Sequence, residues 1–83
     1  SPTFTIVNEY LSDSKKIYHY DFYRLKEKNE LFEIGIDYYL DQPGIHFIEW
    51  PNYFLNYLPT PDIDISLIIL PDSRLVKVER RYE

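Results

Sequence analysis

The carboxylate with the clearest chemical context in the sequence is that of Glu49. It ends a short, mostly apolar run at residues 44–49, and the only tryptophan, Trp50, follows it, with Pro51 next. A run of this kind between Pro43 and Pro51 predicts a buried strand that carries an acid to one edge of a sheet. Ligands collect at the carboxyl ends of strands in α/β proteins, and a carboxylate there can hold Mg²⁺ beside phosphates. The alternative is an exposed strand-end carboxylate in an ordinary salt bridge, and the pattern alone favours that alternative.

Asp21 is the second candidate acid, because it lies within a tyrosine-rich segment that is predicted to be a strand. Strands are depleted in aspartate, so a functional role or a buried partner, Arg24 or His19, must offset its cost. Alternation of side chains along the strand places His19, Asp21 and Tyr23 on one face. Two histidines without metal-ligand spacing argue against a zinc site.

Two further residues could contact a nucleotide. Trp50 could lie against a nucleotide or pack in the core, and the core is the commoner place for a lone tryptophan. Thr3, in the SPTF segment at residues 1–4, offers a hydroxyl that could meet a γ-phosphate or simply form a turn, which is the default.

The elements that must position these residues form an α/β pattern. Residues 3–11 and 17–25 predict two strands around a polar turn, and a second hairpin is expected in the region of residues 63–78, with its turn at 71–73. Asn29 occupies a helix N-cap position before an apolar stripe, and Gly35 separates this helix from a second one that begins near Asp37 and ends at residues 42–44. The stripe comprises Leu31, Phe32, Ile34 and Ile36, and Tyr38, Tyr39 and Leu40 are expected to pack the second helix. One or two helical turns are expected at residues 52–58. The chain is therefore predicted to contain two β-hairpins, a central strand and short helices.

Composition limits the class of protein. With 83 residues the chain is predicted to form one domain, residues 1–83, whose small core is supplemented by an aromatic content of 18%. A net charge of −5 argues against unaided nucleic-acid binding. The absence of cysteine excludes disulfides and thiolate metal sites. No apolar run is long enough for a membrane span and no signal peptide is visible, so a soluble, cytoplasmic protein is expected.

A phosphate-binding loop cannot be found in these 83 residues. The only glycines are Gly35 and Gly44, and neither is followed by Lys-Ser or Lys-Thr. The sequence also has no Gly-x-Ser-x-Gly elbow and no cysteine nucleophile, so covalent catalysis has no candidate.

Four blocks of sequence, taken together, resemble the TsaE family. They are SPTFTIVNEY at residues 1–10, YHYDFYRL at 18–25, IGI at 34–36 with Tyr39-Leu40, and IEWP at 48–51 with Leu58-Pro59. The match runs in order across nearly the whole chain, and the combination is far more specific than any single block. The resemblance implies a P-loop NTPase-like mixed sheet with flanking helices, and the ATPase component of tRNA N6-threonylcarbamoyladenosine modification.

The same resemblance implies roles for four residues. Thr3 would belong to a switch-like loop near the γ-phosphate, and Trp50 would lie next to the nucleotide pocket. Asp21 and Glu49 would be the catalytic, metal-associated acids of a site that uses ATP and Mg²⁺. Hydrolysis would drive or reset the threonylcarbamoyl-transfer complex, with TsaB and TsaD as protein partners.

The chain departs from the family pattern at its start. The phosphate-binding loop and the strand before it should precede SPTF, so we expect residues 1–83 to be the C-terminal portion of a TsaE-like ATPase domain, inactive alone. Asn52 also replaces an acid that often follows EWP in the family. An alternative function is a non-enzymatic interaction module, in which a tyrosine-rich surface and hairpin edges bind a protein and the acids are structural. Pairing of strand edges between copies is a third possibility.

Overall fold

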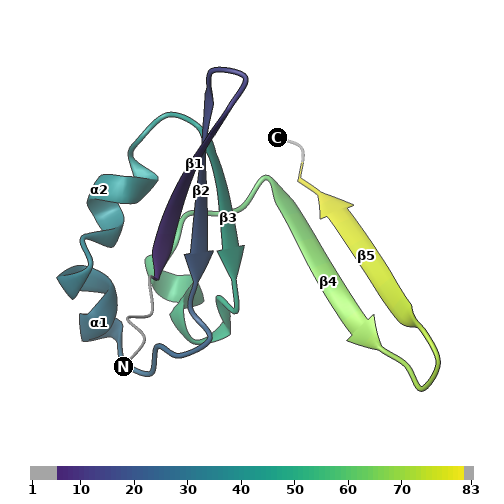
Figure 1. Cartoon of the computed structure of the whole chain (residues 1–83). Helices are drawn as coiled ribbons and strands as arrows, with labels where there is room; N and C mark the ends of the chain where they lie inside the picture. Colours follow the sequence, from purple (N-terminus) through teal and green to yellow (C-terminus); the bar gives the residue numbers. More distant parts are fainter. Residues whose placement is uncertain (1–5, 82–83) are drawn as a thin grey trace, which may run out of the picture.

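The structure is a computed structural model, and it describes residues 6–81. Eight elements follow one another within these residues (Figure 1): β1 (Val7–Ser12), β2 (Lys15–Asp21), α1 (Lys28–Glu33), α2 (Ile36–Leu40), β3 (Ile45–Glu49), the 3₁₀ helix η1 (Asn52–Tyr57), β4 (Ile63–Ile69) and β5 (Arg74–Arg80). The predicted α/β class, the two hairpins and the short helices are confirmed.

A mixed three-stranded sheet positions the candidate acids. Its strand order is β1-β2-β3, with β1 antiparallel and β3 parallel to β2. Helices α1 and α2 connect the parallel pair and lie together on one side of the sheet (Figure 1). The predicted central strand, β3, therefore lies at the edge of this sheet, and β2 is its central strand. The alternation of side chains along each strand then decides which of them meet the helices.

The turn between β1 and β2 is tighter than the five polar residues at 12–16 indicate. Asp13 and Ser14 both have positive φ, 49° and 66°, while Ser12 pairs with Lys15. Positive φ at both central residues defines the two-residue turn whose twist matches that of the flanking strands. Both strands consequently run to the edge of a two-residue loop.

Strand β2 ends at Asp21, four residues before the predicted end. The Tyr23 N–H donates to Asp21 Oδ1 at 3.1 Å, and the Leu25 N–H donates to the Phe22 carbonyl at 3.0 Å. These local hydrogen bonds turn the chain, and the backbone after Phe22 therefore no longer continues the pairing of a strand. The prediction of a strand through Leu25 is wrong for this reason.

The predicted N-cap at Asn29 is also wrong. Helix α1 begins at Lys28, with Glu27 as its N-cap. The Glu30 carboxylate accepts the backbone N–H groups of Lys26 and Glu27 at 3.0 and 3.1 Å. These two bonds lower the pKa of Glu30 below its ordinary value, because they stabilise its charged form. A side chain three residues into the helix thus fixes its start, as in a capping box.

Gly35 separates the two helices as predicted. Its φ of 74° lies in the left-handed region, which costs glycine little and ends α1 immediately before α2. Leu31 and Ile36 are buried as expected, whereas Phe32 and Tyr38 of the predicted apolar positions are more than half exposed.

One face of the sheet carries the core. Tyr18, Tyr20 and Phe22 alternate with exposed or half-buried residues and pack with residues of the helices and of η1. The Phe22 and Phe54 rings pack edge to face, with their centroids 5.9 Å apart. This cluster comprises Tyr18, Tyr20, Phe22, Leu25, Leu31, Ile36 and Phe54. Aromatic side chains thus supply much of a small core.

The opposite face of the sheet is open in the described part of the chain. Ile45 and Phe47 of β3 point to that face and are 44% and 50% exposed, while His46 and Ile48 point to the core. The prediction that residues 44–49 form a fully buried strand is therefore wrong. Only one face of β3 is covered by residues 6–81.

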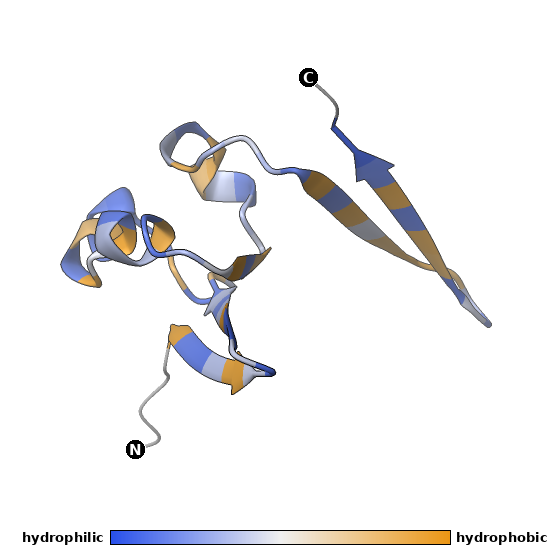
Figure 2. Ribbon diagram, turned by 90° about the horizontal axis from the view of Figure 1, so that it is seen from above, coloured by the Kyte–Doolittle hydropathy of each residue, from blue (hydrophilic) through white to orange (hydrophobic). Residues whose placement is uncertain are grey.

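The second hairpin, β4–β5, forms a two-stranded sheet that stands apart from the first in Figure 1. Its register pairs Ile65 with Val78 and Leu67 with Val76, which puts these side chains on one face. Figure 2 shows the resulting apolar bands along both strands. All four side chains are more than half exposed, so the hairpin carries an apolar face without a cover within residues 6–81.

Candidate active site

Asp21 and Glu49 meet at one edge of the mixed sheet. They are the last residues of β2 and β3, and they are paired in the parallel register. The Phe22 N–H donates to the Glu49 carbonyl at 3.1 Å, which continues the pairing beyond the strand ends. The structure thus brings the two predicted acids together at the carboxyl ends of adjacent parallel strands, where ligands bind in α/β proteins.

Glu49 is accessible and has an imidazole partner. Its side chain is 55% exposed, and its Oε1 contacts the Nε2 of His19, whose side chain is 30% exposed. An ionised carboxylate can only accept hydrogen bonds, so Nε2 carries the proton in this contact. The contact agrees with the alternative that Glu49 is an exposed strand-end carboxylate in an ordinary salt bridge. The exposed part of the Glu49 side chain also remains accessible to a ligand. Its metal role stays a prediction.

Asp21 is held by the backbone rather than by a buried ion pair. The residue is exposed, and its Oδ1 accepts the Tyr23 N–H in the turn after β2. The alternative of a buried partner to Arg24 or His19 is therefore wrong, since Asp21 is not buried and His19 contacts Glu49. A functional role for the Asp21 carboxylate stays a prediction.

Trp50 lies beside the two acids and outside the core. It is 57% exposed, and its ring centroid lies 5.0 Å from that of Tyr23, which is 63% exposed. Its φ of 58° is unusual for a bulky residue and turns the chain sharply after Glu49. The expectation of a core tryptophan is wrong, and a role beside a nucleotide stays a prediction. Thr3 lies outside the described residues.

The donor set fits Mg²⁺ that arrives with phosphates better than a site built from protein alone. Among residues 6–81, no group of three or more His, Asp or Glu side chains could hold a metal ion. Two carboxylates remain at the sheet edge, and Mg²⁺ is usually bound by one or two carboxylates together with substrate phosphates and water. Asp21 and Glu49 would supply these oxygens.

A polar network within the core was missed by the sequence reasoning. The buried Tyr20 hydroxyl donates to His46 Nδ1 at 2.7 Å, and His46 Nε2 donates to the Gln42 carbonyl at 2.8 Å. The His46 ring also stacks on Tyr18, with centroids 4.7 Å apart. Burial raises the pKa of Tyr20 to about 12. The alternation that puts Ile48 on the core face also places His46 there, which is the signal that could have revealed it.

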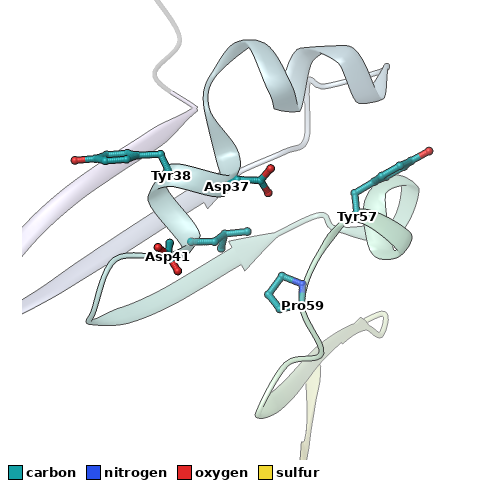
Figure 3. Close-up of a pocket in the computed structure, with 6 residues that line it drawn as sticks. Asp37, Tyr38, Asp41, Tyr57 and Pro59 are labelled. Atoms are coloured by element: carbon teal, nitrogen blue, oxygen red, sulfur yellow. The ribbon is translucent and has the colours of Figure 1, made fainter.

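A shallow depression lies on another part of the surface. Asp37, Tyr38 and Asp41 come from α2 and its end, and Tyr57 and Pro59 from the segment around η1 (Figure 3). Leu40 completes its lining, which includes neither Asp21 nor Glu49. The depression is separate from the candidate site.

The fold and the site define an α/β protein with two carboxylates at the ends of adjacent parallel strands. Comparison with known proteins adds the family. The family model described as "Threonylcarbamoyl adenosine biosynthesis protein TsaE" matches residues 1–76. The chain belongs to the TsaE family, as its sequence blocks predict.

Individual relatives carry the same description. The chain is 37% identical over 83 residues to the tRNA threonylcarbamoyladenosine biosynthesis protein TsaE of Rickettsia bellii. The aligned region covers 99% of this chain and 57% of that protein. It is 38% identical over 78 residues to the TsaE protein of Haemophilus influenzae (94% of this chain, 49% of that protein) and 35% identical over 87 residues to that of Bacillus subtilis (100% and 54%). The chain thus spans about half the length of these curated relatives.

Within residues 6–81, no helix has the length and apolar character required to cross a membrane.

Proposed function

We propose that this chain is part of an ATPase that serves the formation of threonylcarbamoyladenosine in tRNA. The observation that carries the proposal is the pairing of Asp21 with Glu49 at the carboxyl ends of β2 and β3, in a chain of the TsaE family. Relatives named as tRNA threonylcarbamoyladenosine biosynthesis proteins support the pathway. The protein would act in the cytoplasm, with TsaB and TsaD as partners.

The chemistry of the site is divided between this chain and the rest of the protein. A P-loop, which no segment of these 83 residues resembles, would hold the triphosphate. Asp21 and Glu49 would hold Mg²⁺ and its waters, and the bound ion would neutralise charge that develops on the phosphates. Trp50 would lie beside the nucleotide, and Thr3 near the γ-phosphate. Residues 1–83 alone would not hydrolyse ATP.

The first experiment measures steady-state ATP hydrolysis by the full-length protein and its Glu49→Ala variant. Loss of one metal-associated carboxylate should remove several kcal/mol of charge stabilisation, or about 100-fold or more in rate. Glu33→Gln is the matched control, because Glu33 is an exposed acid on α1. It should leave the rate unchanged. An unchanged rate in Glu49→Ala would refute the role given to Glu49.

A second candidate function is the non-catalytic interaction module. The exposed tyrosines favour it, and so does the apolar face of β4–β5, which no other part of residues 6–81 covers. It predicts that the full-length protein neither binds nor hydrolyses ATP. Calorimetric titration of the full-length protein with ATP in the presence of Mg²⁺ therefore separates the two functions.

A further inference from the structure

The imidazole of His19 lies where it can control the orientation of the Glu49 carboxylate. The two residues are on adjacent parallel strands, and His19 precedes Asp21, the register partner of Glu49, by two positions. Residues two apart share a face of a sheet, so the three side chains lie on the same open face. Long side chains reach such diagonal neighbours, and His19 Nε2 contacts Glu49 Oε1.

We propose that His19 is a positioning residue, which holds the Glu49 carboxylate in the orientation required for Mg²⁺-bound ATP. This inference rests on the proposed ATPase function. It assigns to His19 a role through Glu49, without contact to the nucleotide.

The surroundings of His19 make Glu49 its carboxylate partner. Its neighbours on this side of the sheet include Asn8 of β1, Asp21 of its own strand, and Phe47 and Glu49 of β3. Asp21 directs Oδ1 to the Tyr23 N–H in the following turn. The carboxylate that His19 contacts on this face is thus that of Glu49.

The contact also joins a restrained side chain to a more flexible one. His19 is in the central strand of the sheet and its side chain is 30% exposed, whereas Glu49 is at a strand end and is 55% exposed. A glutamate has three rotatable side-chain bonds, and ordering it on ligand binding costs entropy. A donor that fixes the carboxylate beforehand removes part of this cost. Outer partners of metal-binding side chains act in this way, and their loss typically lowers affinity or activity about 10- to 100-fold.

The test compares His19→Leu with His19→Gln in the full-length protein. Leucine removes the donor, whereas glutamine keeps an N–H donor. The dissociation constant for ATP is measured by calorimetry, once with Mg²⁺ and once with EDTA. We expect His19→Leu to weaken ATP binding about 10-fold or more with Mg²⁺ and to leave it unchanged with EDTA, and His19→Gln to recover part of the loss. A general structural defect would weaken binding in both conditions.

A double-mutant cycle with Glu49→Ala tests whether His19 acts through Glu49. In the Glu49→Ala background, His19→Leu should have no further effect on ATP binding with Mg²⁺. An equal effect in both backgrounds would overturn the positioning role. Wild-type binding by His19→Leu would overturn it as well.

A measurement on the free protein keeps the inference testable where a variant does not fold. The ¹⁵N signals of the His19 ring report which nitrogen carries the proton, and we expect Nε2–H in the wild type. A proton on Nδ1 alone would refute the contact. Failure of the ATPase function has a different signature: no ATP hydrolysis by the wild type, or an unaffected Glu49→Ala variant. The positioning role fails alone when Glu49→Ala is impaired and His19→Leu is not.

Discussion

Replacing Tyr20 with phenylalanine should destabilise the protein at neutral pH. At alkaline pH the same replacement should remove the destabilisation that arises because the buried phenol cannot ionise readily. Tyr20 is fully buried, and its hydroxyl donates to His46 Nδ1 at 2.7 Å. Phenylalanine fills nearly the same space but leaves that nitrogen without its donor. A half-buried acceptor that loses its partner costs about 1 to 3 kcal/mol, so the free energy of unfolding should fall by this amount at pH 8.

The pH dependence follows from the pKa of the phenol. Burial raises it from 10.0 to about 12 in the folded protein. Between these values the unfolded chain has lost the proton and the folded chain keeps it, so the contribution of Tyr20 is complete below pH 10 and is lost as the pH rises to 12. Two pKa units correspond to about 2 to 3 kcal/mol. The stability difference between wild type and Tyr20→Phe should therefore shrink to zero or reverse by pH 12.

The assay is urea unfolding of the full-length protein, followed by far-ultraviolet circular dichroism at several values between pH 8 and pH 12. Titrations common to both proteins cancel in the difference. Tyr53→Phe is the control, because Tyr53 is 84% exposed, and its difference from wild type should stay near zero throughout. A Tyr20→Phe difference that does not change with pH would refute the reasoning that the phenol is buried and protonated.

Two further predictions concern backbone geometry and a helix start. Gly44→Ala should destabilise the protein by about 1 to 3 kcal/mol, because φ is 139° and an added Cβ would lie 2.5 Å from the Lys16 carbonyl oxygen. Gly35→Ala should cost only about 1 kcal/mol, because φ is 74° and an added Cβ would meet no atom within 4 Å. Thermal unfolding of both variants checks this, and equal losses would contradict the role of the close approach. Glu30→Gln should lower stability at neutral pH and flatten its acid dependence, since the depressed pKa of Glu30 gives stability that is present above the ordinary value of 4.5 and is lost as the pH falls through the folded value. Urea unfolding between pH 3 and pH 7 measures this effect, and an identical acid dependence in both proteins would contradict it.

The sequence allowed the elements to be predicted better than their ends. Hairpins and the Gly35 break depend on local signals, namely alternation and turn-forming residues, and the sequence contains these signals. The end of β2 and the start of α1 depend on single side chains, Asp21 and Glu30, that bind nearby backbone N–H groups. Such competition between side chain and backbone is not visible in a periodic pattern.

The residues of the candidate site could be predicted from the sequence, but their arrangement in space could not. Asp21 and Glu49 were identified from their sequence contexts, whereas their pairing needs the parallel register of β2 and β3. The contact between His19 and Glu49 needs that register and a side-chain orientation as well. Trp50 is exposed and has a left-handed backbone conformation after the strand, two features that its bulky aromatic side chain argues against.

The apolar face of the β4–β5 hairpin has no cover in the described part of the chain, so the stability of this hairpin depends on what packs against it. A two-stranded hairpin is marginally stable in water on its own, so its backbone hydrogen bonds open readily unless something covers Ile65, Leu67, Val76 and Val78. Its amide protons should then exchange with solvent at rates set by whatever lies on that face. Hydrogen exchange along residues 63–80 would thus report, residue by residue, how completely this side of the molecule is packed in any longer form or complex.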